Sequence, residues 1–170
     1  MSLSVIVLAL VTLQRGFELV LARRNTARLM ARGAVEVGAV HYPLIVAMHA
    51  VWLAGLWLLA WNRPVNLVWL GLFVVLQAGR LWVLASLGPR WTTRIIILPG
   101  EPLVRRGPYR FFSHPNYMVV AGEILVLPLA FGLLVFGLVF SVLNAGILFI
   151  RIRTEQIALA DGQQAVTSSR

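Results

Sequence analysis

Two short segments of the chain hold most of the side chains that could do chemistry. The first runs from residue 88 to 117 and has the sequence GPRWTTRIIILPGEPLVRRGPYRFFSHPNY. It combines the rings of Trp91, Tyr109 and Tyr117 with the imidazole of His114 and many backbone donors. Its five prolines fix φ and its three glycines allow tight turns, so we expect a loop of defined shape. Such a loop could hold a planar, polar, charged small molecule.

The second segment has the sequence Arg151-Ile-Arg-Thr-Glu155-Gln156. Arg151 and Glu155 are four residues apart, so they share one face of a helix. One interpretation is a surface ion pair worth about 0.3–0.5 kcal/mol. The other is a site in which Arg151 acts on a substrate group while Glu155 meets a cationic or hydroxyl-bearing ligand. The first segment also has an alternative, as a basic loop lying on anionic headgroups.

Composition indicates that these segments belong to a membrane protein. Of 170 residues, 59% are hydrophobic and 12% charged, whereas soluble domains average about 45–50% and about 25%. The net charge is +9, and all fifteen basic residues are arginines. They fall between apolar stretches, which favours a membrane surface over nucleic acid. The absence of cysteine excludes disulfides, thiolate metal sites and cysteine nucleophiles.

Five apolar segments predict transmembrane helices, since about 20 residues cross the hydrocarbon core. Three are separate, at Leu3–Leu21, Tyr42–Trp61 and Val65–Leu87. The last two share Met118–Ile150, which is broken near Phe131–Gly137. We predict a tight hairpin of two short or tilted helices there, and a single long helix is the alternative. The fold class is therefore all-α, a polytopic transmembrane bundle of five spans with the long loop before the last hairpin.

The distribution of arginines predicts the orientation of the bundle. Twelve fall on one side of the predicted spans and only Arg63 on the other, while Arg15 and Arg80 lie within spans. The positive-inside rule then places the N-terminus outside and both the C-terminus and the long loop in the cytosol. Residues 1–170 are expected to form a single domain that ends in a polar tail over 161–170.

Several polar side chains fall inside the predicted spans. A charge at mid-bilayer costs at least about 2.5 kcal/mol, so such residues usually pair within a bundle. We expect internal ion pairs of structural character between the arginines and glutamates of this set, and we interpret His49 as a satisfied core or cavity histidine. The set comprises Gln14, Arg15, Glu18, Gln77, Arg80 and Glu123.

Four motifs in order give the chain a family resemblance. They are Glu101-Pro-Leu-Val104, Gly107-Pro-Tyr-Arg110, His114-Pro-Asn-Tyr117 and Arg151-x-x-x-Glu155. This set, from about Trp91 to Leu159, resembles the isoprenylcysteine carboxyl methyltransferase (ICMT) family. The segment from Gly33 to Pro43 resembles short bacterial members, which include enzymes linked to type III polyketide synthases that O-methylate alkylresorcinols or alkylpyrones.

The resemblance implies a cofactor and the residues that contact it. Family members bind S-adenosyl-L-methionine at the cytosolic face, with the loop before the last hairpin around it, so the cofactor-binding part here would be about 88–160. Arg151 and Glu155 inherit the catalytic roles, with Arg151 facing the substrate. The implied cofactor contacts are Arg94, Glu101, Pro102, Leu103, Val104, Tyr109, His114, Pro115, Asn116, Tyr117 and Glu155.

Two positions depart from the family pattern. The family often has histidine at the position of Glu101 and glutamate at the position of Gln156. The first departure argues against a side-chain contact with the cofactor at Glu101 and leaves a backbone contact there. The second removes one acid of the acidic pair that is usual in the family.

The expected function is methyl transfer from S-adenosyl-L-methionine, giving S-adenosyl-L-homocysteine, to an oxygen (hydroxyl or carboxyl) of a lipophilic small molecule such as an alkylresorcinol or alkylpyrone. One alternative is a prenylcysteine-type carboxyl methyltransferase, and another is a non-catalytic membrane scaffold or accessory subunit. The expected location is a bacterial inner membrane. The expected partners are the acceptor and membrane lipids, with no nucleic acid, metal or obligate protein partner.

Overall fold

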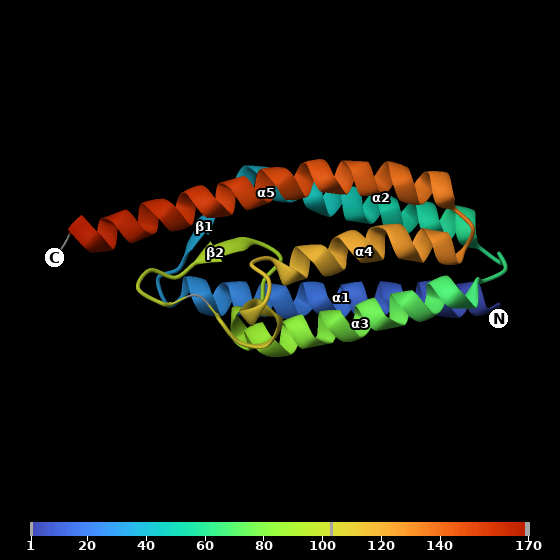
Figure 1. Ribbon diagram of the computed structural model, residues 1–170, viewed down its shortest axis with the longest axis horizontal. Coiled ribbons are helices and arrows are strands. Elements are labelled where there is room, and N and C mark those ends of the chain that lie inside the picture. The colour runs from blue at the N-terminus through green and yellow to red at the C-terminus, as the bar shows by residue number, and fades with distance from the viewer. Residues whose placement is uncertain (1, 103, 169–170) are drawn as a thin grey trace.

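A computed structural model describes residues 2–102 and 104–168, the last ten of them by backbone alone. These residues form five α-helices that lie alongside one another in one elongated bundle (Figure 1). The predicted all-α transmembrane class is confirmed. The helices are α1 (Leu3–Met30), α2 (Tyr42–Ala60), α3 (Leu67–Leu87), α4 (Pro115–Ala130) and α5 (Leu134–Ser168).

Helix length and composition identify an integral membrane protein. The helices α1, α2, α3 and α5 are long and apolar enough to cross a membrane. The helix α4 is apolar but has only 16 residues, which span about 24 Å at 1.5 Å per residue. The bundle therefore combines four full-length spans with one shorter helix.

The last apolar stretch forms a hairpin, so the single-helix alternative is wrong. The helix α4 ends at Ala130 two residues after Pro128, and Gly132 takes the left-handed conformation (φ 69°) that a tight turn requires. The two arms are unequal, since α5 has 35 residues. It continues as helix to Ser168, through most of the segment 161–170 that was expected to be a polar tail.

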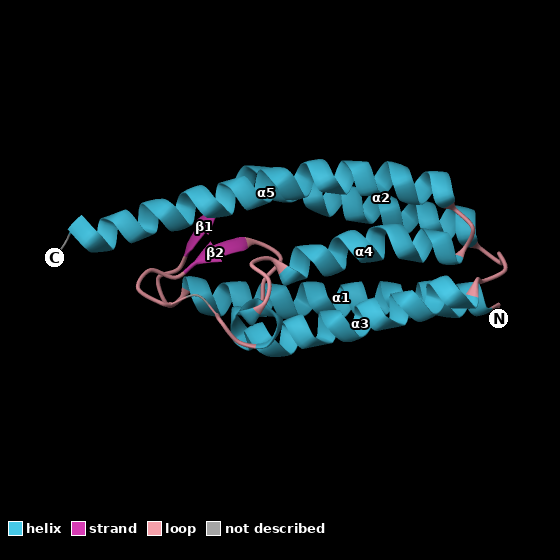
Figure 2. Ribbon diagram, viewed as in Figure 1, coloured by secondary structure: helices cyan, strands magenta, loops and turns pink. Residues whose placement is uncertain are grey.

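A small antiparallel sheet joins two loops at one end of the bundle. Strand β1 (Val35–Val37) follows α1, and β2 (Ile95–Ile97) follows α3, with Glu36 opposite Ile96. Figure 2 shows both strands at the end of the bundle away from the N-terminus. We call this the loop end. The sequence analysis had not anticipated the sheet, which ties the loop after α1 to the long loop.

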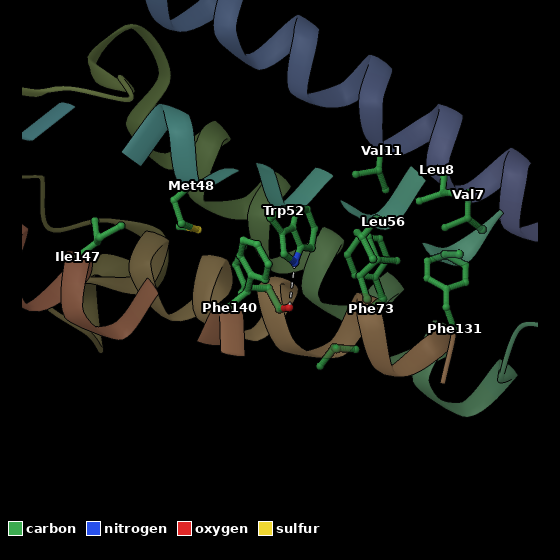
Figure 3. Close-up of a cluster of buried hydrophobic side chains, with 14 residues drawn as sticks. Val7, Leu8, Val11, Met48, Trp52, Leu56, Phe73, Phe131, Phe140 and Ile147 are labelled. Atoms are coloured by element: carbon green, nitrogen blue, oxygen red, sulfur yellow. Dashed lines mark hydrogen bonds between the residues drawn. The ribbon is translucent and has the colours of Figure 1, made fainter. Parts of the chain in front are cut away.

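The main hydrophobic core lies among all five helices. Trp52 of α2 is almost fully buried near its centre, and its indole nitrogen donates to the Ile124 carbonyl oxygen of α4 at 3.3 Å (Figure 3). Leu8, Phe73 and Phe140 extend the core into α1, α3 and α5. The core holds the five helices together.

Candidate functional site

Two arginines and two glutamates pair inside the bundle. Arg15 Nη2 lies 2.7 Å from Glu123 Oε2, and Arg80 Nη1 lies 2.9 Å from the same oxygen. Both arginines also pair with Glu18, so the four charges cancel. The predicted internal ion pairs are therefore confirmed, and each arginine pairs with both glutamates.

Two glutamines complete this cluster. Gln14 Nε2 donates to Gln77 Oε1 at 2.8 Å, and Gln77 Nε2 donates to Glu123 Oε1 at 2.9 Å. The helices α1, α3 and α4 are thereby cross-linked by hydrogen bonds within the apolar interior. We call these six residues the charge network: Gln14, Arg15, Glu18, Gln77, Arg80 and Glu123.

The start of α4 brings several predicted site residues together. The Tyr117 hydroxyl donates to Glu155 Oε2 at 2.9 Å, and the His114 ring stacks on the Tyr117 ring with centroids 5.3 Å apart. His114 Nδ1 lies 3.8 Å from the same Glu155 oxygen. Pro115 provides the first residue of the helix, where its fixed φ is favourable and its missing N–H costs nothing. Asn116 follows Pro115 and shares the first turn with Tyr117.

Arg151 also lies beside the Tyr117 ring. Its Cζ is 5.6 Å from the ring centroid, and its Nη1 donates to the Thr93 carbonyl oxygen at 3.0 Å. No Arg151–Glu155 ion pair occurs among the described residues. Both side chains instead contact Tyr117, which favours the site interpretation of this pair over the surface ion pair.

A cavity of about 410 Å³ joins this cluster to the charge network. Arg151, Asn116 and Tyr117 line it at the loop end, and Arg15 and Arg80 line it deeper in the bundle. Its volume falls within the range of about 300–1,000 Å³ that is usual for small-molecule sites. The cavity is therefore large enough for the head of a small ligand.

Residues that line the cavity also contain buried polar atoms that are unsatisfied. Among the described residues, five buried side-chain nitrogen or oxygen atoms have no hydrogen-bond partner, and all five residues line this cavity. An unsatisfied buried polar group costs about 1–3 kcal/mol, so a polar ligand that supplied partners would be stabilised here. The atoms are Arg15 Nε, Trp91 Nε1, Asn116 Oδ1, Asn144 Oδ1 and Arg151 Nε.

Tyr109 lies close to the same cluster. It is half-buried against a second apolar group formed by Ala22, Val83 and Trp91. Burial, reinforced by the Glu155 carboxylate, raises the pKa of the Tyr109 phenol. Tyr109 therefore stays protonated and can act as a hydrogen-bond donor.

Gly107 allows the loop that carries Tyr109 to lie directly on α3. Its φ is 59°, and a Cβ atom there would lie 2.0 Å from the Ser86 hydroxyl oxygen. The neighbouring Arg106 Nε donates to the Ser86 carbonyl oxygen at 2.7 Å. No larger residue fits at position 107 without moving the loop.

Arg94 makes contacts away from the cavity. Its Nη1 lies 2.8 Å from both carboxylate oxygens of Glu36, and its Cζ lies 4.3 Å from the Tyr42 ring centroid. The hydrogen bonds to Glu36 raise the pKa of the Arg94 guanidinium. Its contact with the cofactor stays a prediction.

Glu101 and Pro102 also lie apart from the cavity lining. Glu101 pairs with Arg32, near the end of α1, and lies 3.6 Å from Arg90 Nη1. Arg90 in turn donates to the Pro102 carbonyl oxygen at 2.9 Å. Val104, two residues after Pro102, is half-buried. Leu103 lies outside the described residues.

Several cavity residues were not anticipated from the sequence. Thr93 supplies the carbonyl that Arg151 contacts, and its hydroxyl lies 3.1 Å from the Tyr42 hydroxyl. Asn144 is a lone amide within an apolar span, and this polarity was the available signal. Thr93 carried no comparable signal, because its role depends on a backbone carbonyl.

The fold and the site together define an integral membrane protein with a ligand cavity at one end of a helical bundle. Residues 69–161 match the isoprenylcysteine carboxyl methyltransferase (ICMT) family. The chain belongs to this family, which makes it a membrane methyltransferase. It is also similar to the uncharacterized protein YpbQ of Bacillus subtilis (strain 168), at 40% identity over 161 residues, 92% of this chain and 96% of that protein. No solved structure matches the chain.

Proposed function

We propose that the protein transfers the methyl group of S-adenosyl-L-methionine to an oxygen of a lipophilic small molecule. The observation that carries this proposal is the position of Tyr117, between Glu155 and Arg151 at one end of the cavity. An acidic and a basic side chain thus face one site from the same helix. The family membership supplies the reaction class, and this arrangement supports the division of roles below.

The residues at the start of α4 fit the cofactor. S-adenosyl-L-methionine would supply a methyl group activated by a sulfonium charge. Glu155 offers the negative charge that a cationic ligand requires. The Tyr117 hydroxyl holds its carboxylate by a hydrogen bond, and His114 Nδ1 lies 3.8 Å from the same oxygen. The Asn116 amide has an unsatisfied oxygen for a polar group of the ligand.

Arg151 is suited to the acceptor. Its guanidinium stays protonated, so it stabilises an ionised oxygen by a charge-assisted hydrogen bond and does not act as a base. Its Nη1 is held by the Thr93 carbonyl, which fixes its direction before the acceptor binds. A phenol or enol ionises readily, so most of the catalysis would be proximity and orientation.

The tail of the acceptor would remain in the lipid. The cavity lining includes Leu19 of α1 and Val46 and Ala50 of α2, all exposed on the outside of the bundle. An amphiphile could therefore place its head in the cavity without leaving the bilayer. The arginine distribution supports a cytosolic loop end, with the N-terminus outside a bacterial inner membrane.

The preferred acceptor is a small lipid with an acidic hydroxyl, such as an alkylresorcinol or alkylpyrone. The deep wall of the cavity contains Arg15, Glu18 and Arg80. Such a wall suits a ring with several polar atoms better than a wholly apolar prenyl chain. This observation favours the hydroxylated lipid over the alternative prenylcysteine-type acid.

A methyl-transfer assay tests this function. The protein in lipid nanodiscs would receive S-adenosyl-L-methionine labelled in its methyl group and one of three acceptors: a pentadecyl resorcinol, an alkyl hydroxypyrone or farnesylated N-acetylcysteine. We expect labelled methyl ether from the resorcinol or the pyrone. Transfer to the farnesylcysteine alone would contradict the acceptor class. Folded protein that neither binds the cofactor nor transfers its methyl group would be a scaffold or accessory subunit.

A further inference from the structure

His49 presents an unused hydrogen-bond acceptor to the cavity. Its Nδ1 lies 2.9 Å from the Ile45 carbonyl oxygen. A carbonyl oxygen only accepts, so Nδ1 carries the proton, and the uncharged ring then leaves Nε2 as an acceptor. His49 lines the cavity, and its Nε2 makes no hydrogen bond with any described residue. This nitrogen is available to a ligand hydroxyl.

The hydrogen bond to Ile45 also sets the depth of the ring. Tyr42 marks the loop end of the cavity, since its hydroxyl contacts the Thr93 hydroxyl and Arg151 donates to the Thr93 carbonyl. Ile45 lies three residues further along α2, which is about 4.5 Å along the helix axis. The imidazole is therefore held roughly one turn deeper than the end of the cavity where Arg151 lies.

Arg15 of α1 contributes a donor to the same cavity. Its side chain is 18% exposed, compared with 6% or less for Glu18, Arg80 and Glu123. Its Nε has no hydrogen-bond partner among the described residues. The charge network thus holds Arg15 in its charged form and leaves Nε, a buried donor of a residue that lines the cavity, without a partner among the described residues.

We propose that His49 and Arg15 form a second polar subsite, which binds a ring oxygen of the acceptor other than the one that is methylated. This proposal rests on the proposed function and narrows its substrate class to lipids whose ring carries at least two oxygens. A hydroxyl there donates to His49 Nε2 and accepts from the Arg15 guanidinium. A site built for such a hydroxyl discriminates against an analogue that lacks it, because its own polar groups are then left unpaired.

Binding of two matched lipids tests the subsite without requiring catalysis. Calorimetry on the full protein in nanodiscs would compare a pentadecyl resorcinol with the pentadecyl phenol that lacks its second hydroxyl. We expect the resorcinol to bind wild-type protein at least about tenfold more tightly, the value of one net hydrogen bond. In His49→Leu the ratio should fall to about one, with affinity for the phenol retained, and His49→Gln should restore part of the preference through its amide.

The matched control is His41→Leu, which removes a histidine that lies outside this cavity and should keep the preference. Arg15 is left unchanged because its removal would leave Glu18 and Glu123 with Arg80 as their one remaining partner among the described cations and so disturb the charge network. Equal binding of both lipids to wild type, or an equal loss of both in His49→Leu, would overturn the subsite. A preference that depends on His49 in protein that transfers no methyl group would support the subsite and contradict the proposed function. Methyl transfer by protein that binds both lipids equally would support the proposed function and contradict the subsite.

Discussion

The charge network and the cluster at the loop end contain the same kinds of side chain, but their hydrogen bonding differs. In the network, Glu123 is almost fully buried and receives bonds from Arg15, Arg80 and Gln77. At the loop end, the buried atoms Asn116 Oδ1 and Arg151 Nε have no partner among the described residues. Among the described residues the network satisfies its buried polar atoms except Arg15 Nε and so holds the helices together, whereas the less complete cluster at the loop end is prepared for a ligand.

The largest expected effect is the loss of stability in Glu123→Ala. The substitution removes one of the two carboxylates that Arg15 and Arg80 share, so Glu18 alone remains and one positive charge is uncompensated. Breaking such a buried pair costs about 3–5 kcal/mol, which would show in denaturant unfolding of the protein in mixed micelles. The milder Glu123→Gln keeps an acceptor for Gln77 and should lose less. If Glu123→Ala were as stable as the wild-type protein, the structural role assigned to the network would be wrong.

Arg151→Ala should lower activity and leave stability almost unchanged. It removes the group that stabilises the ionised oxygen, so methyl transfer should fall by about 100-fold or more. The free energy of unfolding should change by less than about 1 kcal/mol, because Arg151 belongs to no ion pair in the described residues. Arg153→Ala is the matched control, since this exposed arginine lies over Phe149 away from the cavity. Full turnover in Arg151→Ala at saturating acceptor would contradict its assigned role.

Tyr117→Phe tests the cluster at the loop end without changing the charge network. The change deletes the hydroxyl that donates to Glu155 and keeps the ring that lies beside Arg151 and His114. Glu155 would then be held less firmly, and we expect S-adenosyl-L-methionine affinity to fall by about tenfold. Calorimetry measures this directly. Unchanged affinity would show that the Tyr117 hydroxyl does not position the carboxylate for the cofactor.

Glu36→Gln should have the smallest effect. Arg94 is 39% exposed in its ion pair with Glu36, and exposed pairs contribute about 0.2–1 kcal/mol. The pair also helps the two-stranded sheet join the loops, so a modest drop in the thermal unfolding midpoint is expected. A loss as large as that in Glu123→Ala would mean that the sheet, and not the charge network, holds the loop end in place.

The spans were predictable because a bilayer imposes their length. The apolar stretch Tyr42–Trp61 differs from α2 by one residue, whereas α1 continues nine residues past the expected end at Leu21. The additional residues of α1 include arginines, so this helix extends beyond the apolar stretch. The sheet was not predictable, since each strand has three residues and Val35 pairs with Ile97, far along the chain.

The site was predictable where the motifs themselves make the contacts. The positions of Tyr117, His114 and Glu155 follow from the first turn of α4 lying against α5. Glu101 and Arg94 contact other loops instead, because arginines and acids from distant segments meet them there. The cavity is lined by residues of all five helices and of the long loop, and no local pattern specifies how these segments meet. His49 was assigned to a core or cavity position, and only the fold shows that it lines a cavity with one nitrogen free of described partners.

Binding of the cofactor at the loop end is the central claim, and calorimetry tests it most directly. Detergent-purified protein would be titrated with S-adenosyl-L-methionine or S-adenosyl-L-homocysteine, beside the double variant Tyr109→Ala, His114→Ala. We predict binding to wild type and its loss in a double variant that remains folded, since both side chains lie next to Glu155 at the start of α4. Equal binding by the double variant, or no binding by folded wild-type protein with added lipid, would contradict it.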